Sequence, residues 1–374
     1  MVNLIKILSV NIYLNYKFCR LLFQHFPNKK IWRRAFYNYL LDARYGHQTT
    51  KKQAATNKRW VLEGFTSKRL KLIKKATQKA NVKKDFEMPV LVCVLNNEME
   101  KLPLFFSHYR EMGIKRFVMI DNMSSDGTYE FLLKQKDVEL YSVKETFRGY
   151  LKEGWINQIL ALYGYDRWYL VVDADELLVW PQMERVSLKN LIRICQAKKE
   201  YRPMAIMLDM YSRGKLFCNQ TSNIYSEFSY CDLDTYYWIK NQEVDILSGG
   251  PRERVFGSKV WLSKTPLFYL KPMDIFCCAH YMYPYKKDRK RCCPIALLHY
   301  KFAYESSYSM MKEYVKKGVD ENRIEESKIY FGKKRAVLFY EGSLHLDKSE
   351  KLSKIKCLTN IAEQELGADE TNAW

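Results

Sequence analysis

The chain has 374 residues, of which 47% are hydrophobic and 15% are aromatic, so it can bury a substantial core. This composition excludes wholesale disorder and collagen-like or coiled-coil architectures. The net charge is +20, but it is unevenly distributed. Residues 1–87 contain 20 of the 62 basic residues and only four of the 42 acidic residues, so the other 287 residues carry a net charge of only +4. The excess positive charge therefore belongs to an N-terminal extension.

The N-terminal extension begins with an apolar but interrupted stretch. No stretch of the chain reaches the roughly 18–20 apolar residues that a transmembrane helix requires. Lys6, Lys17 and Arg20 break the first 26 residues, and no small-residue cleavage site follows, so we expect no secretory signal. On a helix these cations share one side with Gln24, which is compatible either with a helix at a membrane surface or with a core-packing helix. We expect a cytoplasmic protein that associates peripherally with the anionic inner (plasma) membrane through this extension.

Strand-like and helix-like segments then follow one another along the chain. Residues 47–84 are polar and basic, which indicates a linker or a solvated helix. From residue 88 onward, strands are expected at 89–95, 116–121, 138–143, within 168–180 and at 205–210, and helices at 101–112, from 128, at 153–163 and at 306–317. Alternation of buried strands and helices predicts a Rossmann-like α/β fold with a mostly parallel sheet.

This pattern divides the chain into three regions. We expect a basic, helical extension at 1–87, a main domain at 88–305 and a C-terminal helical region at 306–374. Within the main domain, residues 88–180 form the half with regular alternation, and residues 181–305 form a less regular α+β half.

Cysteines form two adjacent pairs, Cys277–Cys278 and Cys292–Cys293, with His280 nearby. Zinc sites usually have two residues between their cysteines, and adjacent cysteines cannot easily face one tetrahedral ion. We therefore expect reduced, mostly buried thiols rather than a zinc site.

Acidic side chains follow the apolar strand within 168–180. Asp173 and Asp175 are separated by one residue, so on an extended chain both point to the same side. Two carboxylates at the end of a buried strand are costly unless a cation compensates them. Mg²⁺ or Mn²⁺, held by one or two carboxylates and by substrate phosphates, suits this setting. The alternative is a solvated loop with helix-capping acids.

Three segments carry a family resemblance: VCVLNNE, IDNMSSDGT and VVDADE, within residues 89–180. Together they resemble the nucleotide-sugar domain of GT-A fold glycosyltransferases, and most of all the family 2-like branch found in bacterial surface-polysaccharide and lipopolysaccharide synthesis. Asn157 lies near the place where that family often has an Arg-Asn pair, although Ile156 replaces the arginine. Asn122 replaces the family's second loop aspartate.

The resemblance implies roles for individual residues. It implies that Asp173 and Asp175 flank the metal ion that bridges the donor diphosphate, and that a late histidine, His299 or in second place His280, returns to that metal ion. The side chains that it implies near the donor nucleotide are Asn97, Glu98, Asp121, Asn122, Asp126 and Asn157.

Residues 181–305, the half of the main domain that we expect to bind the acceptor, contain no Glu-Asp pair of the kind that supplies the catalytic base in family 2 enzymes. An inverting transfer needs a carboxylate that accepts the proton of the acceptor hydroxyl. Asp245 and Glu253 are the candidates for this role, with Asp209 behind them. Arg252, Arg254 and Lys264 are candidates for contact with the donor diphosphate or with an acidic acceptor, and the alternative for each is an exposed charge with no such role. Of the three, Arg252 is the one that we expect to contact the donor.

We therefore expect a metal-dependent glycosyltransferase that uses Mn²⁺ or Mg²⁺. It would move a monosaccharide from a nucleotide-diphosphate sugar to a glycan or lipid-linked glycan acceptor in lipopolysaccharide or capsule synthesis. Inversion is favoured by the resemblance, and retention stays open. Two alternatives remain: a catalytically silent nucleotide-sugar-binding module, and a nucleic-acid-binding protein, although the chain lacks the usual nucleic-acid-binding motifs.

Overall fold

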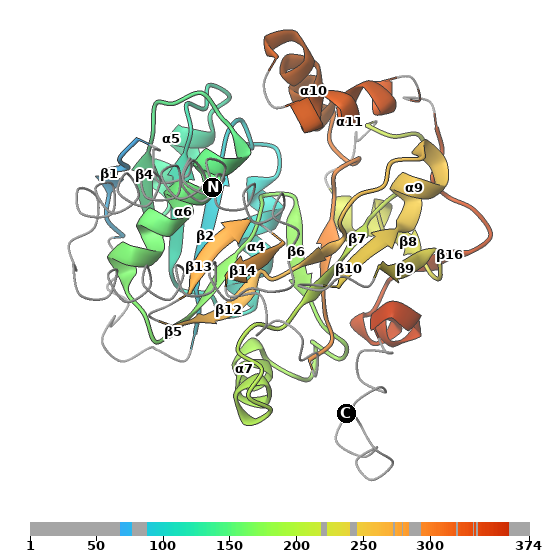
Figure 1. The fold of residues 1–374 in the computed structure, drawn as a ribbon, viewed down its shortest axis with the longest axis horizontal. Helices are drawn as coiled ribbons and strands as arrows, with labels where there is room; N and C mark the ends of the chain where they lie inside the picture. Colours follow the sequence, from blue (N-terminus) through green and yellow to red (C-terminus); the bar gives the residue numbers. More distant parts are fainter. Residues whose placement is uncertain are drawn as a thin grey trace, which may run out of the picture.

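The computed structural model describes residues 68–76, 88–217, 223–239, 245–271, 274–278, 280–283, 293–318, 321–331, 333 and 336–358 (Figure 1). The expected helix at the start of the chain lies outside these residues. No helix within the described residues is long and apolar enough to cross a membrane.

A six-stranded sheet has the strand order β1-β4-β3-β2-β5-β12 and takes its four middle strands from residues 88–180. Its strands are β1 (Lys71–Lys74), β2 (Val90–Leu95), β3 (Phe117–Asp121), β4 (Val138–Ser142), β5 (Arg167–Val171) and β12 (Leu267–Leu270). The four middle strands are parallel, whereas β1 and β12 pair antiparallel at the two edges. The α/β class expected from the sequence is confirmed.

Helices cover both faces of this sheet because alternate strand residues point to opposite sides. On β2, Leu91 and Cys93 belong to one hydrophobic cluster and Val90 and Val92 to another. Helix α4 (Leu102–Glu111) packs in the first cluster and α6 (Gly149–Tyr163) in the second. The third connecting helix is α5 (Thr128–Lys134).

Helix α4 also joins the central sheet to a neighbouring strand, β6 (Glu176–Val179). The Tyr109 hydroxyl donates to the Glu176 carbonyl at 2.8 Å, and the Leu178 N–H donates back to that hydroxyl at 3.1 Å. His108 contacts the Leu178 carbonyl through Nε2 at 2.8 Å and the Tyr225 hydroxyl through Nδ1 at 2.7 Å. A carbonyl can only accept, so Nε2 carries the proton and Nδ1 accepts from Tyr225.

The second sheet has four strands in the order β11-β7-β15-β6. Strands β7 (Ala205–Asp209) and β15 (Ile295–His299) are parallel, whereas β6 and β11 (Ser263–Lys264) are antiparallel to their neighbours. The apolar segment 168–180 is therefore not one strand. It divides into β5 and β6, which lie in different sheets, because residues 173–175 form a tight turn closed by a hydrogen bond from the Glu176 N–H to the Asp173 carbonyl at 3.1 Å.

The remaining elements lie around the two sheets (Figure 1). They are α7 (Leu188–Ala197), α8 (Ile224–Glu227), β8 (Tyr230–Asp232), β9 (Tyr236–Ile239), β10 (Ile246–Gly249), α9 (Gly250–Phe256), β13 (Ile275–Cys278), β14 (Tyr281–Tyr283), α10 (Glu305–Lys317), α11 (Glu321–Phe331), β16 (Ser343–His345) and the 3₁₀ helix η2 (Ser349–Lys354).

Two regions in which the sequence predicted helices, residues 1–87 and residues 306–374, each contain a strand. Lys71–Lys74, within the extension expected to be helical, forms strand β1, which pairs with β4 and buries part of Ile73 against the core. In the C-terminal region, α10 confirms the helix expected at 306–317. Beyond α11, however, Ser343–His345 forms a strand that pairs with β8. In both places backbone pairing with a distant strand overrides local helical preference.

Candidate functional site

A cavity of about 240 Å³ opens where the parallel strands of both sheets end. Open α/β sheets bind ligands at the carboxyl ends of their strands. Residues from β2, the β5–β6 turn, β15, α6, α10 and α11 surround it: Val94, Leu95, Asn96, Glu98, Lys101, Phe147, Lys152, Asp173, Ala174, Asp175, His299, Lys301, Ser307, Met310, Met311, Tyr314, Glu326, Ser327 and Tyr330. The sequence-predicted metal ligands Asp173, Asp175 and His299 are thus brought to one cavity.

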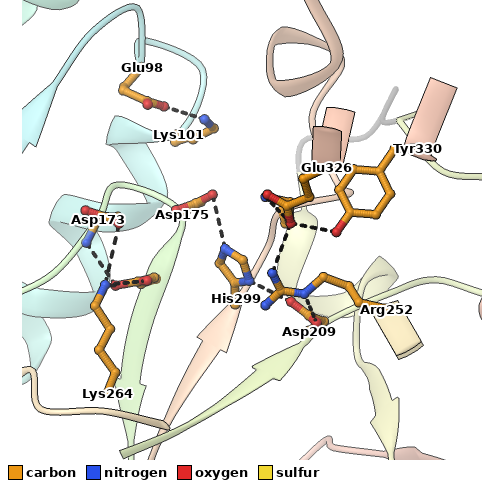
Figure 2. Close-up of polar contacts among 12 residues, drawn as sticks. Glu98, Lys101, Asp173, Asp175, Asp209, Arg252, Lys264, His299, Glu326 and Tyr330 are labelled. Atoms are coloured by element: carbon orange, nitrogen blue, oxygen red, sulfur yellow. Dashed lines mark hydrogen bonds and ion pairs between the residues drawn. The ribbon is translucent and has the colours of Figure 1, made fainter. Parts of the chain in front are cut away.

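Asp173 lies between two lysines. Lys152 on α6 pairs with its Oδ1, and Nζ of Lys264 lies 3.5 Å from its Oδ2 (Figure 2). Nζ of Lys264 also bonds both carboxylate oxygens of Glu176 at 2.6 Å. Burial opposes the charge on Asp173, but the two lysines outweigh it and hold its pKa below the ordinary range. Lys264 therefore stabilises the acidic turn at residues 173–175 through its contacts with both Asp173 and Glu176.

A chain of charged contacts connects Asp175 to Arg252 through His299 and Asp209 (Figure 2). Oδ2 of Asp175 lies 3.6 Å from Nε2 of His299, and Nδ1 of His299 bonds Asp209 at 2.6 Å. Asp209, which is fully buried, accepts from Nε of Arg252 at 2.7 Å on its other oxygen. Burial would lower the pKa of His299, but Asp175 and Asp209 raise it to about 9. The histidine ring is consequently fixed in orientation by two carboxylates.

The donor set at this end of the cavity suits a hard divalent cation. The side chains of Asp173 and Asp175 keep 32% and 20% of their surface exposed. Metal-binding histidines usually bond a carboxylate through their other ring nitrogen, as His299 does with Asp209. Within the described residues no group of three or more His, Cys, Asp and Glu side chains forms a ready-made cage. A cation bound here would displace the proton that Asp175 and Asp209 stabilise on His299, and would complete its shell with substrate oxygens and water.

Glu98 lines the same cavity and forms an ion pair with the buried Lys101 (Figure 2). Burial raises the pKa of Glu98 to about 7; Lys101 opposes this shift, and the nearby charges of Asp175 and Asp173 add to it. Glu98, which the sequence resemblance implies near the donor nucleotide, thus lines the cavity, whereas Lys101 carried no recognisable sequence signal.

The loops that follow β2 and β3 hold each other together. Oδ1 of Asn97 accepts from the Ser125 N–H at 2.7 Å. The two carboxylate oxygens of Asp126 accept from the backbone N–H groups of Met99 and Thr128, each at 3.0 Å. Asn97 and Asp126, both predicted to contact donor, thus use their side-chain oxygens to shape the loops.

The end of β3 contains a carboxylate with an unsatisfied oxygen. Asn122 donates to the backbone carbonyls of Val143 and Glu145, which fixes its amide. Asp121 is nearly fully buried; its Oδ2 receives one long hydrogen bond from the Ser124 N–H at 3.4 Å, and its Oδ1 has no partner. A buried oxygen without a partner is costly, but Asp121 is absent from the residues that line the cavity.

Asn97, Asp121, Asn122 and Asp126 are absent from the cavity lining, and the other predicted site residues do not border the cavity either. Asn157 ties α6 to β13 by two hydrogen bonds with the Phe276 backbone, at 2.7 and 3.1 Å. Glu253 on α9 accepts from the Tyr237 hydroxyl at 2.9 Å, and Asp245 lies just before β10. Arg252 reaches the cavity indirectly, through Asp209 and Glu326.

Several cavity residues carried no sequence signal. Lys152 and Lys301 were single cations among many, and Glu326 and Tyr330 lie on a charged helix without a motif. A lysine inside an otherwise apolar helical stretch, such as Lys152 in α6, was the one available hint.

The remaining histidine and cysteine candidates are also outside the cavity lining. Nδ1 of His280 bonds the Ser263 carbonyl at 2.8 Å, and burial lowers its pKa to about 4. Cys293 is a buried free thiol whose Sγ lies 2.9 Å from Sγ of Cys195. The thiols of Cys277, Cys278 and Cys292 lie outside the described part of the structure.

No protein-family model matches the sequence, and no curated protein matches it either. Among solved structures, the chain is similar to HddC from Yersinia pseudotuberculosis complexed with GMP-PN, with 12% identity and a TM-score of 0.23, over 36% of this chain and 65% of that chain. A second HddC structure from that organism matches with 11% identity and a TM-score of 0.26, over 50% and 77%. S. aureus TarS 1-349 matches with 12% identity and a TM-score of 0.26, over 74% and 80%. The chain spans less than two thirds of the first structure, and at these TM-scores the likenesses carry no argument about function.

Proposed function

We propose that the protein is a metal-dependent glycosyltransferase that transfers a monosaccharide from a nucleotide-diphosphate sugar to a glycan acceptor. The observation that carries the proposal is the cavity at the carboxyl ends of the strands, where Asp173, Asp175 and His299 meet Lys101, Lys152 and Lys301. Carboxylates and an imidazole suit a divalent cation, and lysines suit phosphate oxygens. A diphosphate joined to a cation matches both kinds of side chain.

The donor would occupy the side of the cavity next to the six-stranded sheet. Glu98, in the loop after β2, lines the cavity and can accept from an N–H or hydroxyl of the nucleoside. Lys152, on the N-terminal part of α6, is suited to the diphosphate. Asp175 and His299 would hold Mn²⁺ or Mg²⁺, with Asp173 beside them. The cation would stabilise the negative charge of the departing diphosphate.

The biological setting follows from the sequence resemblance. The family 2-like segments support a role in lipopolysaccharide or capsule synthesis, with inversion at the anomeric carbon and a lipid-linked acceptor. The basic residues 1–67, which contain 12 Lys and Arg against Asp42 and Glu63, would attract the enzyme to anionic lipids. Under this proposal the extension serves membrane attachment and the cavity serves transfer.

A panel of UDP- and GDP-sugars, with and without Mn²⁺ or Mg²⁺, tests the proposal by the release of UDP or GDP. Wild-type protein should release nucleotide from at least one donor, and excess EDTA should stop the release. Asp175→Asn should lower turnover by about 100-fold or more, while its melting temperature stays near that of the wild type. Asp234→Asn provides the matched control, because Asp234 is exposed and outside the cavity lining.

Two results would contradict this function. Full turnover by Asp175→Asn, or full turnover in excess EDTA, would exclude the proposed role of the cation. A rise in melting temperature with UDP or GDP, but no turnover with any donor, would indicate the silent nucleotide-sugar-binding module instead.

A further inference from the structure

Four carboxylates line the described cavity: Glu98, Asp173, Asp175 and Glu326. The first three follow strands of the central sheet, and each has a cation directly opposite it: Lys101, the lysine pair at Asp173, and His299, respectively. Glu326 differs because it comes from α11, in the C-terminal helical pair. Figure 2 shows it across from Asp175, on the other side of His299.

Glu326 is held firmly by one of its two oxygens. The Tyr330 hydroxyl donates to Oε1 at 2.6 Å, Nζ of Lys301 lies 3.3 Å from it, and Nη1 of Arg252 lies 3.4 Å from it. Burial opposes ionisation of Glu326, but Lys301 and Arg252 outweigh it and lower its pKa below the ordinary range. The carboxylate is thus charged and oriented, and Oε2 is left to accept a further hydrogen bond.

The position of Glu326 is coupled to the proposed metal end of the cavity. Arg252 contacts both Glu326 and the fully buried Asp209, and Asp209 orients His299 beside Asp175. A single buried guanidinium therefore sets the placement of the carboxylate on α11 relative to Asp175. Rigid placement of this kind is what a group acting on one substrate atom requires.

Building on the proposed function, we propose that Glu326 is the catalytic base that takes the proton from the acceptor hydroxyl. The acceptor oxygen forms a bond to the anomeric carbon, and the bond from that carbon to the diphosphate oxygen breaks, its electron pair leaving with the nucleoside diphosphate. The acceptor proton moves to Oε2 of Glu326. The wall formed by α10 and α11 is then the acceptor side of the cavity.

The other acidic candidates have settings that suit this step less well. Asp245 and Glu253, the candidates from the sequence, are absent from the cavity lining. Asp209 has no exposed surface, and both its oxygens are bonded, one by Arg252 and one by His299. Asp173, Asp175 and Glu98 are assigned to the donor side by the proposed function, and Glu98 is also paired with the buried Lys101.

The test compares Glu326→Gln and Glu326→Ala with the wild type, and uses Glu325→Gln as the matched control, because Glu325 is the exposed neighbour on the same helix. The probes are the donor identified by nucleotide release and para-nitrophenyl glycosides as acceptors. Glu326→Gln should lower kcat for transfer by about 10²–10⁴-fold, with an unchanged thermal shift on adding UDP or GDP with Mn²⁺. Sodium formate, which supplies an external carboxylate, should restore part of the activity of Glu326→Ala but not of Asp175→Asn.

The outcomes separate this inference from the proposed function. Wild-type protein that binds no UDP or GDP and turns over no donor overturns both. An active wild type together with a fully active Glu326→Gln overturns the role of Glu326 alone. The role of Glu326 is also overturned if both Glu326 variants melt like the wild type and lose transfer, but sodium formate restores no activity to Glu326→Ala.

Discussion

The ion pair between Lys264 and Glu176 allows a quantitative prediction about the support of the acidic turn. Nζ of Lys264 contacts both oxygens of Glu176 at 2.6 Å, and both side chains are almost fully buried. Replacing Lys264 by Met keeps most of the side-chain volume but removes the charge. Glu176 then retains only the hydrogen bond from the Asp173 N–H at 3.0 Å.

The magnitude follows from the asymmetry of buried ion pairs. Removing one partner leaves an uncompensated buried charge, which typically costs about 3–5 kcal/mol of the free energy of unfolding. At about 2–4 °C per kcal/mol for a domain of this size class, Lys264→Met should melt roughly 10 °C below the wild type. The double variant Lys264→Met/Glu176→Gln should recover most of this loss, because no charge then remains buried without a partner.

Thermal unfolding followed by circular dichroism, with urea titration alongside, measures both quantities. The control is Lys259→Met, an exposed lysine just before the same strand, which should stay within about 0.5 kcal/mol of the wild type. The reasoning is refuted if Lys264→Met melts like Lys259→Met. It is equally refuted if adding Glu176→Gln makes Lys264→Met less stable rather than more stable.

Three further predictions concern the rest of the molecule. Burial lowers the pKa of His108 to about 4 against about 6.5 in the unfolded chain, so the contribution of His108 to stability should be constant above pH 6.5 and fall by up to about 3 kcal/mol as the pH drops towards 4. A flatter urea-midpoint profile below pH 6.5 in His108→Gln would support this, and an identical profile would contradict it. Gly249→Ala should lower the free energy of unfolding by well over 1 kcal/mol, because φ is +99° and the new Cβ would lie 2.2 Å from the backbone carbonyl oxygen of Thr235. Gly257→Ala should lower it less, because φ is +71° and no atom lies within 4 Å of the new Cβ; equal melting temperatures of the two variants would disprove this difference. Protein lacking residues 1–67, but keeping strand β1, should no longer sediment with anionic vesicles while its nucleotide release persists; continued sedimentation would assign the basic charge another purpose.

Local sequence patterns predicted most strands and helices of residues 88–180 correctly, and also the strand β7. The run VLVCVL is the strand β2, the helix expected at 101–112 is α4, and the strand expected at 205–210 is β7. These elements are encoded by hydrophobic periodicity over a few residues, which a sequence displays directly. The same reasoning placed Asp173 and Asp175 at a strand end, and both line the cavity.

Errors arose where a distant partner decides the structure. Nothing near Asp173 in the sequence indicates that β5 and β6 enter different sheets, or that Lys71–Lys74 pairs with β4. Likewise, Asn157 has the residue type of a donor contact but bonds the Phe276 backbone, 119 residues away. Backbone groups buried by packing must find partners, and those partners are set by which elements lie side by side.

Local patterns in the sequence are enough to predict most strands and helices of residues 88–180, the excess positive charge of residues 1–87, and the acidic pair at a strand end. Only the tertiary structure decided which charges face that pair: Lys152 and Lys264 at Asp173, and His299 at Asp175. It alone also brought Glu326 to the opposite wall. The physical reason is that periodicity and propensity act between neighbours in the chain, whereas the electrostatic setting of a carboxylate depends on groups within a few ångströms in space.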